Sequence, residues 1–228
     1  MKRISIAIDG PAGSGKSTIA KILSKKLGFV YIDTGAMYRT VAYYCIENGI
    51  SPTDEVPVVE ALDNIEMDIK MEDSIQHMIL NGKDVTSLIR TAEVGQGASD
   101  VGVFIPVRDK MVSIQQEMAK KISVVMDGRD IGTVVLPDAE VKLYMIADVN
   151  ERARRRFVEF QAQGKPDTYE EVVEQIKFRD HNDMTRDYNP LRKADGAIEI
   201  DTTGKSIDET AEQVLDIIFE KTGVKYGN

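Results

Sequence analysis

The chain has 228 residues, of which 42% are hydrophobic, and its formal net charge is −9. That length suits a single α/β domain with a small insert, and the acidic balance disfavours general binding to a nucleic-acid backbone, which needs a broad basic surface. No apolar run approaches the roughly 18 residues that span a bilayer, the first residues lack a signal-peptide pattern, and one cysteine, Cys45, allows no intrachain disulfide. We therefore expect a cytoplasmic protein without nucleic-acid or membrane partners.

Apolar, β-rich runs alternate with helical patterns along most of the chain. Strands are expected, in chain order, at residues 3–8, 29–32, 122–126, 141–146 and 197–200. Helices are expected at residues 16–27, 36–48, 150–163, 168–188 and 206–222. Such alternation is typical of parallel strands joined by helical crossovers. We therefore predict a three-layer α/β fold with a parallel central sheet of about five strands flanked by helices, and with ligand sites at the carboxyl ends of the strands.

Residues 63–90 break this alternation. Apolar side chains occupy every second position from Ile65 to Met71, which is the period of a strand with one solvated face. A second apolar run, residues 75–80, ends at an Asn-Gly pair, a strong hairpin signal. The pattern predicts a small antiparallel β insert. A solubilising excursion is one interpretation, but we favour a substrate-binding flap because the insert lies between segments with candidate site residues.

Residues 10–17 match the phosphate-binding pattern G-x-x-x-x-G-K-[ST], between a predicted strand and a predicted helix. Glycines let the backbone turn so that N–H groups cradle phosphate oxygens, and the helix start adds its dipole. Lys16 can reach the β- and γ-phosphates, and the Ser17 hydroxyl can ligate Mg²⁺. We predict a P-loop nucleotide site, with ATP as co-substrate and Mg²⁺ as cofactor, formed by Gly10, Pro11, Ala12, Gly13, Ser14, Gly15, Lys16, Ser17 and Thr18.

The P-loop occurs in switches, motors and small-molecule kinases. A guanine-reading N-K-x-D tetrapeptide, which GTPase switches normally carry, does not occur. The apolar run 124–126 ends at Asp127, but Gly128-Arg129 follows instead of the Glu that motor ATPases carry there. Asp127 is therefore a candidate for contact with a metal-bound water or for orienting Lys16.

Arginines cluster at helical spacing in the second half of the chain. Arg152, Arg155 and Arg156 are spaced i, i+3 and i+4 and share a helix face. Like charges on one face repel unless an anion binds, which favours a phosphate clamp, while a solvated helix with ion pairs is the equal alternative. The next predicted helix has a second shared face with Arg179, Asp183 and Arg186.

Four segments, in order along the whole chain, resemble the bacterial-type cytidylate kinase family. They read IDGPAGSGKST at residues 8–18, DTGAMYR at 33–39, DGRDIGT at 127–133 and RDxxDxxR at 179–186, with Pro190-Leu191 following. DGRDIGT discriminates best, because adenylate kinases and eukaryotic UMP/CMP kinases carry Asp-Gly-Phe-Pro-Arg there, and shikimate kinases expect Asp-x-Asp after the second strand. The resemblance implies one P-loop kinase domain over 1–228, with a monophosphate-binding insert over 63–100 and a helical lid with an arginine-bearing helix over about 150–190.

The resemblance also implies a reaction. ATP would donate its γ-phosphoryl group to CMP or dCMP, giving ADP and CDP or dCDP, with Mg²⁺. The expected catalytic residues are Lys16, Arg129, Arg155 and Arg186. The family pattern assigns the acceptor phosphate to Arg39, Arg129 and Arg186, the pyrimidine to Thr34, Ser99, Arg108 and Asp130, and the ribose to Arg179 and Asp183, with Tyr38 also in the acceptor site. Some members carry Ser at position 34, so Thr34 adds a methyl group.

Chemistry supports these roles. Cytosine has an exocyclic amino donor that a carboxylate accepts, so Asp130 predicts a preference for cytosine over uracil. The acceptor phosphate has a second pKa of about 6, so no general base is needed, and catalysis is positioning and charge neutralisation. The alternatives are a P-loop kinase for another small acceptor and a nucleotide-dependent switch, which needs fewer arginines. We expect a monomer.

Overall fold

The computed structural model describes residues 3–72, 75–162 and 164–225. The chain forms two compact units. The first joins Met1–Phe29 to Ile122–Asn228 and carries the P-loop, and the second is Val30–Lys121. In the described ranges, no helix has both the length and the apolar character that crossing a bilayer requires. The single domain expected over 1–228 stays a prediction.

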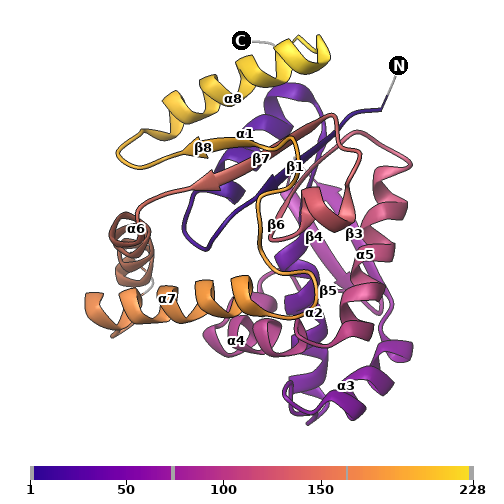
Figure 1. Cartoon of the computed structure of the whole chain (residues 1–228). Helices are drawn as coiled ribbons and strands as arrows, with labels where there is room; N and C mark the ends of the chain where they lie inside the picture. Colours follow the sequence, from indigo (N-terminus) through magenta and orange to yellow (C-terminus); the bar gives the residue numbers. More distant parts are fainter. Residues whose placement is uncertain (1–2, 73–74, 163, 226–228) are drawn as a thin grey trace. The chain divides into compact units, whose positions relative to one another are not determined.

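The first unit is built on parallel strands (Figure 1). Their order is β6, β1, β7 and β8, which are Val124–Gly128, Ser5–Asp9, Val141–Ile146 and Ile198–Asp201. In register, Ile6 lies between Val125 and Val141, and its side chain is fully buried. Apolar runs of this kind suit a parallel sheet that is covered on both faces. β2, Val30–Asp33, is the fifth strand of the sheet, so the predicted number of about five is confirmed.

Two helices cover this sheet next to the P-loop. α1, Lys16–Leu27, packs against β6 and against α8, Ile207–Thr222, which also contacts β7. α1 ends at Gly28 and α8 at Gly223, both in the left-handed conformation that closes helices. Ser206 begins α8 with a capping box. Both helices lie within one residue of the bounds that the sequence predicts.

α6, Val149–Ala162, and α7, Tyr169–Thr185, pack against each other in the first unit (Figure 1). Thr168 starts α7 with a second capping box. α7 ends three residues before the predicted end at residue 188, because the backbone is extended at Arg186. The buried cluster between the two helices consists of Ala153, Phe160, Val172 and Ile176.

The turn after β6 forms a π-helical segment, η3, at Ile131–Val135. The sequence gives no signal for it. Its first two amides, from Ile131 and Gly132, donate to the two carboxylate oxygens of Asp9, each at 2.7 Å. Asp9 is the last residue of β1, so a distant strand fixes the turn that follows the β6 segment.

The second unit is largely helical. α2, Thr34–Glu47, is capped by Asp33, whose carboxylate accepts from the amide of Ala36 at 2.9 Å, and packs against α4 and α5. The sequence predicts α2 only. The remaining helical elements are α3 (Glu55–Ala61), η1 (Leu62–Asn64), η2 (Leu88–Arg90), α4 (Ala92–Val101) and α5 (Ile105–Ala119).

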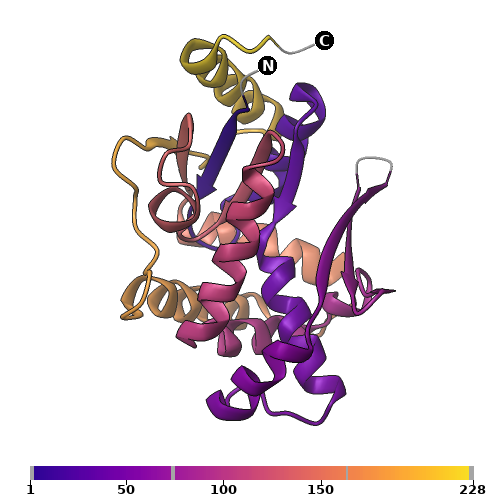
Figure 2. The same ribbon diagram turned by 90° about the vertical axis from the view of Figure 1, so that its right-hand side faces the viewer.

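The predicted antiparallel insert is confirmed within the second unit. β3, Met67–Glu72, pairs antiparallel with β4, Ile75–Leu80, and Figure 2 shows the two strands side by side. β4 then pairs with the short β5, Lys83–Asp84. Between them, Asn81 at φ 48° and Gly82 at φ 81° are both left-handed, as a tight two-residue hairpin requires.

Candidate active site

The P-loop follows β1 closely. Gly10 has φ 147°, and a Cβ there would lie 2.0 Å from the carbonyl oxygen of Met145 on β7. No side chain fits at that distance, so the close approach of the loop to β7 requires glycine. Gly15 has φ 89° at the N-cap of α1, where the orphan amides of the helix turn toward the loop. The glycine-rich turn and the helix start are therefore present at the positions that the motif indicates, and phosphate binding by them stays a prediction.

Lys16 lies inside this loop and is only 5% exposed. Its Nζ donates to the carbonyl oxygen of Pro11 at 2.7 Å and to Ser14 Oγ at 3.4 Å. Burial, followed by the nearby charge of Arg129, lowers the pKa of Lys16 to about 7. An anion placed beside Lys16 would favour its charged form and raise its pKa again.

Ser17 and Asp127 meet at the start of α1 and the end of β6. Ser17 Oγ donates to Asp127 Oδ2 at 2.7 Å. A hydroxyl and a carboxylate are the hard oxygen ligands that Mg²⁺ uses together with phosphates, so these residues fit the expected ion. Among the described residues, no group of three or more His, Cys, Asp and Glu side chains is placed to hold a metal. An ion here would rely on this pair, on water and on the nucleotide.

Arg129, directly after β6, meets the face of α7 that carries Asp183 within the first unit. Arg129 Nε donates to Asp183 Oδ2 at 2.6 Å. Burial by itself would lower the pKa of Arg129, but the carboxylate of Asp183 outweighs it and raises the pKa above the usual value. Burial by itself would likewise raise the pKa of Asp183, but Arg129 lowers it. The two groups therefore stay charged.

Arg186 lies beside the same pair. Its guanidinium is 3.9 Å from Asp130 Oδ1 and 4.0 Å from Asp183 Oδ1, and its Nε donates to the carbonyl oxygen of Asn189. Asp130 is 6% exposed. Of the sequence candidates on this side, the structure thus brings together Arg129, Asp130, Asp183 and Arg186. Arg179 is exposed on α7, but its charge still acts on Asp183 and adds to that of Arg129 in lowering the pKa of that carboxyl.

The arginines of α6 have carboxylate partners. Arg152 is buried and pairs with Asp180 at 2.7 Å, Arg155 pairs with Glu151 at 3.0 Å, and Arg156 pairs with Glu159 at 2.9 Å. These carboxylates offset the repulsion that favoured a phosphate clamp, which fits the alternative of a helix with ion pairs. The partners of Arg155 also differ from the expected phosphate contact, and its catalytic role stays a prediction.

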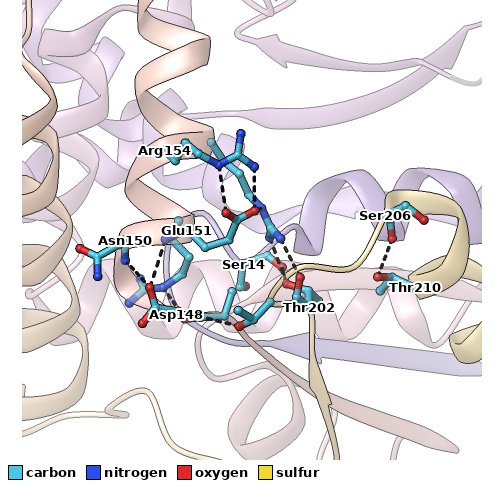
Figure 3. Close-up of polar contacts among 12 residues, drawn as sticks. Ser14, Asp148, Asn150, Glu151, Arg154, Thr202, Ser206 and Thr210 are labelled. Carbon is cyan, nitrogen blue, oxygen red and sulfur yellow. Dashed lines mark hydrogen bonds and ion pairs between the residues drawn. The ribbon is translucent and has the colours of Figure 1, made fainter.

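The start of α6 is tied to the P-loop and to the loop after β8 (Figure 3). Arg155 donates to the hydroxyl and carbonyl oxygens of Thr202, and Thr202 Oγ1 donates to the carbonyl oxygen of Ser14 at 3.2 Å. Arg152 donates to the carbonyl oxygen of Ala12 at 3.0 Å. Asp148 accepts from the first amides of α6. These bonds orient α6 against the P-loop, and sequence spacing does not reveal them.

The remaining candidates lie in the second unit. Arg39 donates to Asp33 Oδ2 at 2.9 Å, and Thr34 is buried in the first turn of α2. Arg108 is 2% exposed, donates to the carbonyl oxygen of Gly102 and lies over the ring of Tyr38 at 5.6 Å. Ser99, on α4, is half-buried. Arg39 is thus held by its own helix cap, and Arg108 by α4 and α2.

Two residues with a part in this geometry are absent from the sequence predictions. Asp9 caps η3, and Gln76 accepts from the amide of Asp33 at 2.8 Å through Oε1, which helps to hold the cap that orients Arg39. Both are buried polar side chains on strands. Asp9 directly follows a mostly apolar run and precedes the P-loop glycine, and this position was the one signal that the sequence offered.

The comparisons with solved structures show the fold. An uncharacterized protein from Eubacterium ventriosum aligns with a TM-score of 0.54 at 14% identity, over 95% of this chain and 98% of that one. A shikimate kinase from Acinetobacter baumannii, in complex with shikimate, aligns with a TM-score of 0.50 at 14% identity, over 97% of this chain and 96% of that one. At this identity the likeness concerns architecture alone.

The sequence comparisons identify a family. A family model described as cytidylate kinase matches residues 6–220. A cytidylate kinase of Caldicellulosiruptor bescii is 50% identical over 220 residues, covering 96% of this chain and 97% of the relative. A cytidylate kinase of Bacillus anthracis is 49% identical over 218 residues, with the same coverage. With its P-loop, its DGRDIGT turn and these relatives of nearly equal length, this chain belongs to the cytidylate kinase family.

Proposed function

We propose that this protein transfers the γ-phosphoryl group of ATP to CMP or dCMP, giving ADP and CDP or dCDP. The observation that carries the proposal is the DGRDIGT turn at the end of β6. There a buried carboxylate, Asp130, and two arginines, Arg129 and Arg186, lie in the unit that holds the P-loop. A carboxylate that reads an amino group, beside guanidinium groups that bind phosphate, matches a cytosine nucleotide.

On the donor side, the P-loop amides and Lys16 bind the phosphates of ATP. Ser17 and Asp127 would hold Mg²⁺ together with water and phosphate oxygens, and the ion would supply charge neutralisation for phosphoryl transfer. Lys16, with a pKa lowered to about 7 by burial, becomes fully charged beside phosphate. The adjacent loop after β8, through Thr202, holds α6 near this donor site.

On the acceptor side, Arg129 and Arg186 bind the CMP phosphate, and Asp130 accepts from the cytosine amino group. Arg179 and Asp183 are assigned to the ribose. In the second unit we assign Arg39 to the acceptor phosphate. Thr34, Tyr38, Ser99 and Arg108 are assigned to the nucleoside.

The attacking atom is a phosphate oxygen that is mostly ionised near neutral pH, since its second pKa is about 6. No side chain therefore has to remove a proton, and the arginines and Lys16 act by placing the two phosphates in line and neutralising their charge. Arg155 would join them when the α6–α7 segment closes over the donor as a lid and excludes water. A monomer in the cytoplasm is the setting that we infer for this reaction.

The deciding experiment is a coupled ADP-release assay with ATP, Mg²⁺ and a panel of CMP, dCMP, UMP, AMP, GMP and dTMP. Strong stimulation by CMP and dCMP is expected. Stimulation by another monophosphate alone would move the assignment to a different acceptor, and ATP turnover without any acceptor would favour a switch or ATPase.

Lys16→Ala should lower kcat in this assay by on the order of 10²–10³, because one donor to the transferred phosphoryl group is lost. The matched control is Lys25→Ala on the exposed face of α1, which should leave kcat unchanged. Unchanged turnover in Lys16→Ala, with the circular dichroism spectrum of the wild type, would contradict the P-loop role.

A further inference from the structure

We propose that Asp9 is a positioning residue for acceptor selection: it caps the turn after β6 and thereby leaves the Asp130 carboxylate to read the base. The inference rests on the proposed function of Asp130. It concerns a residue on β1 that makes no contact with either substrate in that proposal. The support comes from hydrogen bonding, burial and backbone geometry in the first unit.

The first step is the bidentate contact of Asp9. Its Oδ1 accepts from the amide of Ile131 and its Oδ2 from the amide of Gly132, each at 2.7 Å. The side chain is 2% exposed. Both carboxylate oxygens are therefore engaged by consecutive amides of η3, and the group points at backbone rather than at a ligand. Hydrogen bonds to a charged acceptor of this length are among the stronger ones in proteins.

The second step concerns Asp130. It occupies the N-cap position of η3, at φ −140° and ψ 26°, and makes no side-chain cap hydrogen bond. Aspartate is a preferred N-cap residue because its carboxylate normally accepts from the amides one turn into the helix. Here Asp9 accepts from the N2 amide, Gly132, which an N-cap carboxylate would use, and also from the N1 amide, Ile131. The Asp130 carboxylate is thereby kept out of the local cap, and it lies 3.9 Å from the guanidinium of Arg186.

The third step is why position 9 requires a carboxylate. Both partners are donors, so an asparagine, which has nearly the same shape, must turn an NH₂ group toward one of the two amides. The space is tight: a Cβ on Gly132 would lie 3.3 Å from Asp9 Oδ2 and 3.2 Å from Ala194 Cβ. η3 cannot shift far to recover the lost bond, so we expect the preceding residue, Asp130, to change its direction.

Burial raises the pKa of Asp9 to about 6, although the two backbone hydrogen bonds oppose that shift. The carboxylate is therefore mostly ionised above about pH 7 and can accept both amides. The ionisable groups that face it are Lys16 from α1, Asp130 from the η3 turn and Tyr144 from β7. Of these, Lys16 is assigned to the phosphates of ATP, so a change in its charge should affect kcat/KM for CMP and for UMP equally.

The test compares kcat/KM for CMP and for UMP, with the KM for ATP and the melting temperature, in four proteins. These are the wild type, Asp9→Asn, Asp130→Asn and the control Asp138→Asn, which changes an exposed carboxylate on the loop after η3. Asp9→Asn should reduce the CMP-to-UMP ratio about tenfold, the loss expected for one hydrogen bond to a charged group. The KM for ATP should change less than about twofold, since the P-loop bonds are untouched.

The double variant Asp9→Asn/Asp130→Asn should lose no more selectivity than Asp130→Asn alone, because both changes act through one carboxylate. Equal losses with CMP and UMP in Asp9→Asn, accompanied by a lower melting temperature, would overturn the inference and leave Asp9 with a structural role. If Asp130→Asn lowers the CMP-to-UMP ratio and Asp9→Asn does not, the positioning role of Asp9 is wrong while the base contact of Asp130 stands. An unchanged ratio in Asp130→Asn would overturn the proposed base contact and the inference with it.

A measurement on the wild type keeps the inference testable if Asp9→Asn does not fold. The CMP-to-UMP ratio should fall as the pH is lowered through about 6, because protonated Asp9 cannot accept both amides. The two substrates share the same phosphate titration, so it cancels in the ratio. This fall should be absent in Asp130→Asn. A constant ratio in the wild type over the same range would overturn the inference.

Discussion

At the scale of single residues, the strongest electrostatic feature is a lysine enclosed by the loop that it serves. Lys16 is 5% exposed, and burial together with Arg129 lowers its pKa to about 7. Its Nζ donates to the carbonyl oxygen of Pro11, which is a local bond of the P-loop itself. Triphosphate brings several negative charges to the same place, and opposite charge favours the ammonium form.

ATP binding should therefore take up a proton on Lys16. At about pH 8 the lowered pKa leaves free Lys16 mostly neutral, and it becomes charged in the complex, so the uptake approaches about one proton. Near pH 6 free Lys16 is already charged, so the proton uptake vanishes. Calorimetry of ATP binding in buffers of different ionisation enthalpy measures this uptake. The control is Lys16→Met, which removes the titrating group. Equal uptake in wild type and variant would show that another group titrates.

At the scale of elements, α6 and α7 are joined by a buried ion pair as well as by apolar contacts. Arg152 on α6 pairs with Asp180 on α7 at 2.7 Å, with side-chain exposures of 7% and 14%. The same guanidinium donates to the carbonyl oxygens of Ala147 and Ala12. One arginine thus joins α7, the start of α6 and the P-loop, and removal of its carboxylate partner leaves a buried charge without compensation.

Asp180→Ala should lower the free energy of unfolding by about 3 kcal/mol, the lower end for breaking a buried pair. The matched control on the same helix is Glu174→Ala, because the Glu174 side chain is 73% exposed and that of its partner Lys177 is 54% exposed. It should cost less than about 1 kcal/mol. Urea unfolding of both variants measures the difference. Equal costs would mean that the buried pair contributes no more than the exposed one.

At the scale of the whole molecule, a chain of net charge −9 gathers several cationic side chains in the unit that carries the P-loop. Lys16, Arg129 and Arg186 lie in one unit, each with carboxylates near it. Small phosphate ligands respond to this local arrangement, whereas a long nucleic acid would meet the acidic remainder of the surface. Ligands that bind only the folded state add their binding free energy to its stability.

CMP at about 100 times its Kd should stabilise the protein by about 2.7 kcal/mol, which corresponds to a rise in melting temperature of about 5–10 °C for a chain of this length. UMP at the same concentration should give a smaller rise, and single-stranded DNA none. Differential scanning fluorimetry measures all three. A rise with DNA that matches the rise with CMP would contradict selective nucleotide binding. Light scattering in the same buffer tests the expected monomer of 25.4 kDa.

The sequence by itself determined the features that depend on neighbours along the chain. The P-loop, the alternation of strands and helices, and the Asn81-Gly82 hairpin follow from backbone preferences and short-range periodicity, and all are present. Local preference also explains why the sequence does not predict the helix α4. α4 contains Gly95 and Gly97, which weaken any helix signal. The helix packs against α2, and a Cβ at Gly97 would lie 3.2 Å from Ala42 Cβ and from Pro52 Cγ, so the close packing there needs glycine.

Tertiary structure decided which side chains meet. Asp9 and Ile131 are 122 residues apart in sequence, and the register of β1 with β6 brings the end of one strand to the turn after the other. The arginines of α6 share the face that their spacing predicts, but carboxylates on α6 and α7 pair with them. A sequence gives the charge of each side chain, whereas its partner depends on distances that exist only once the strands and helices have packed.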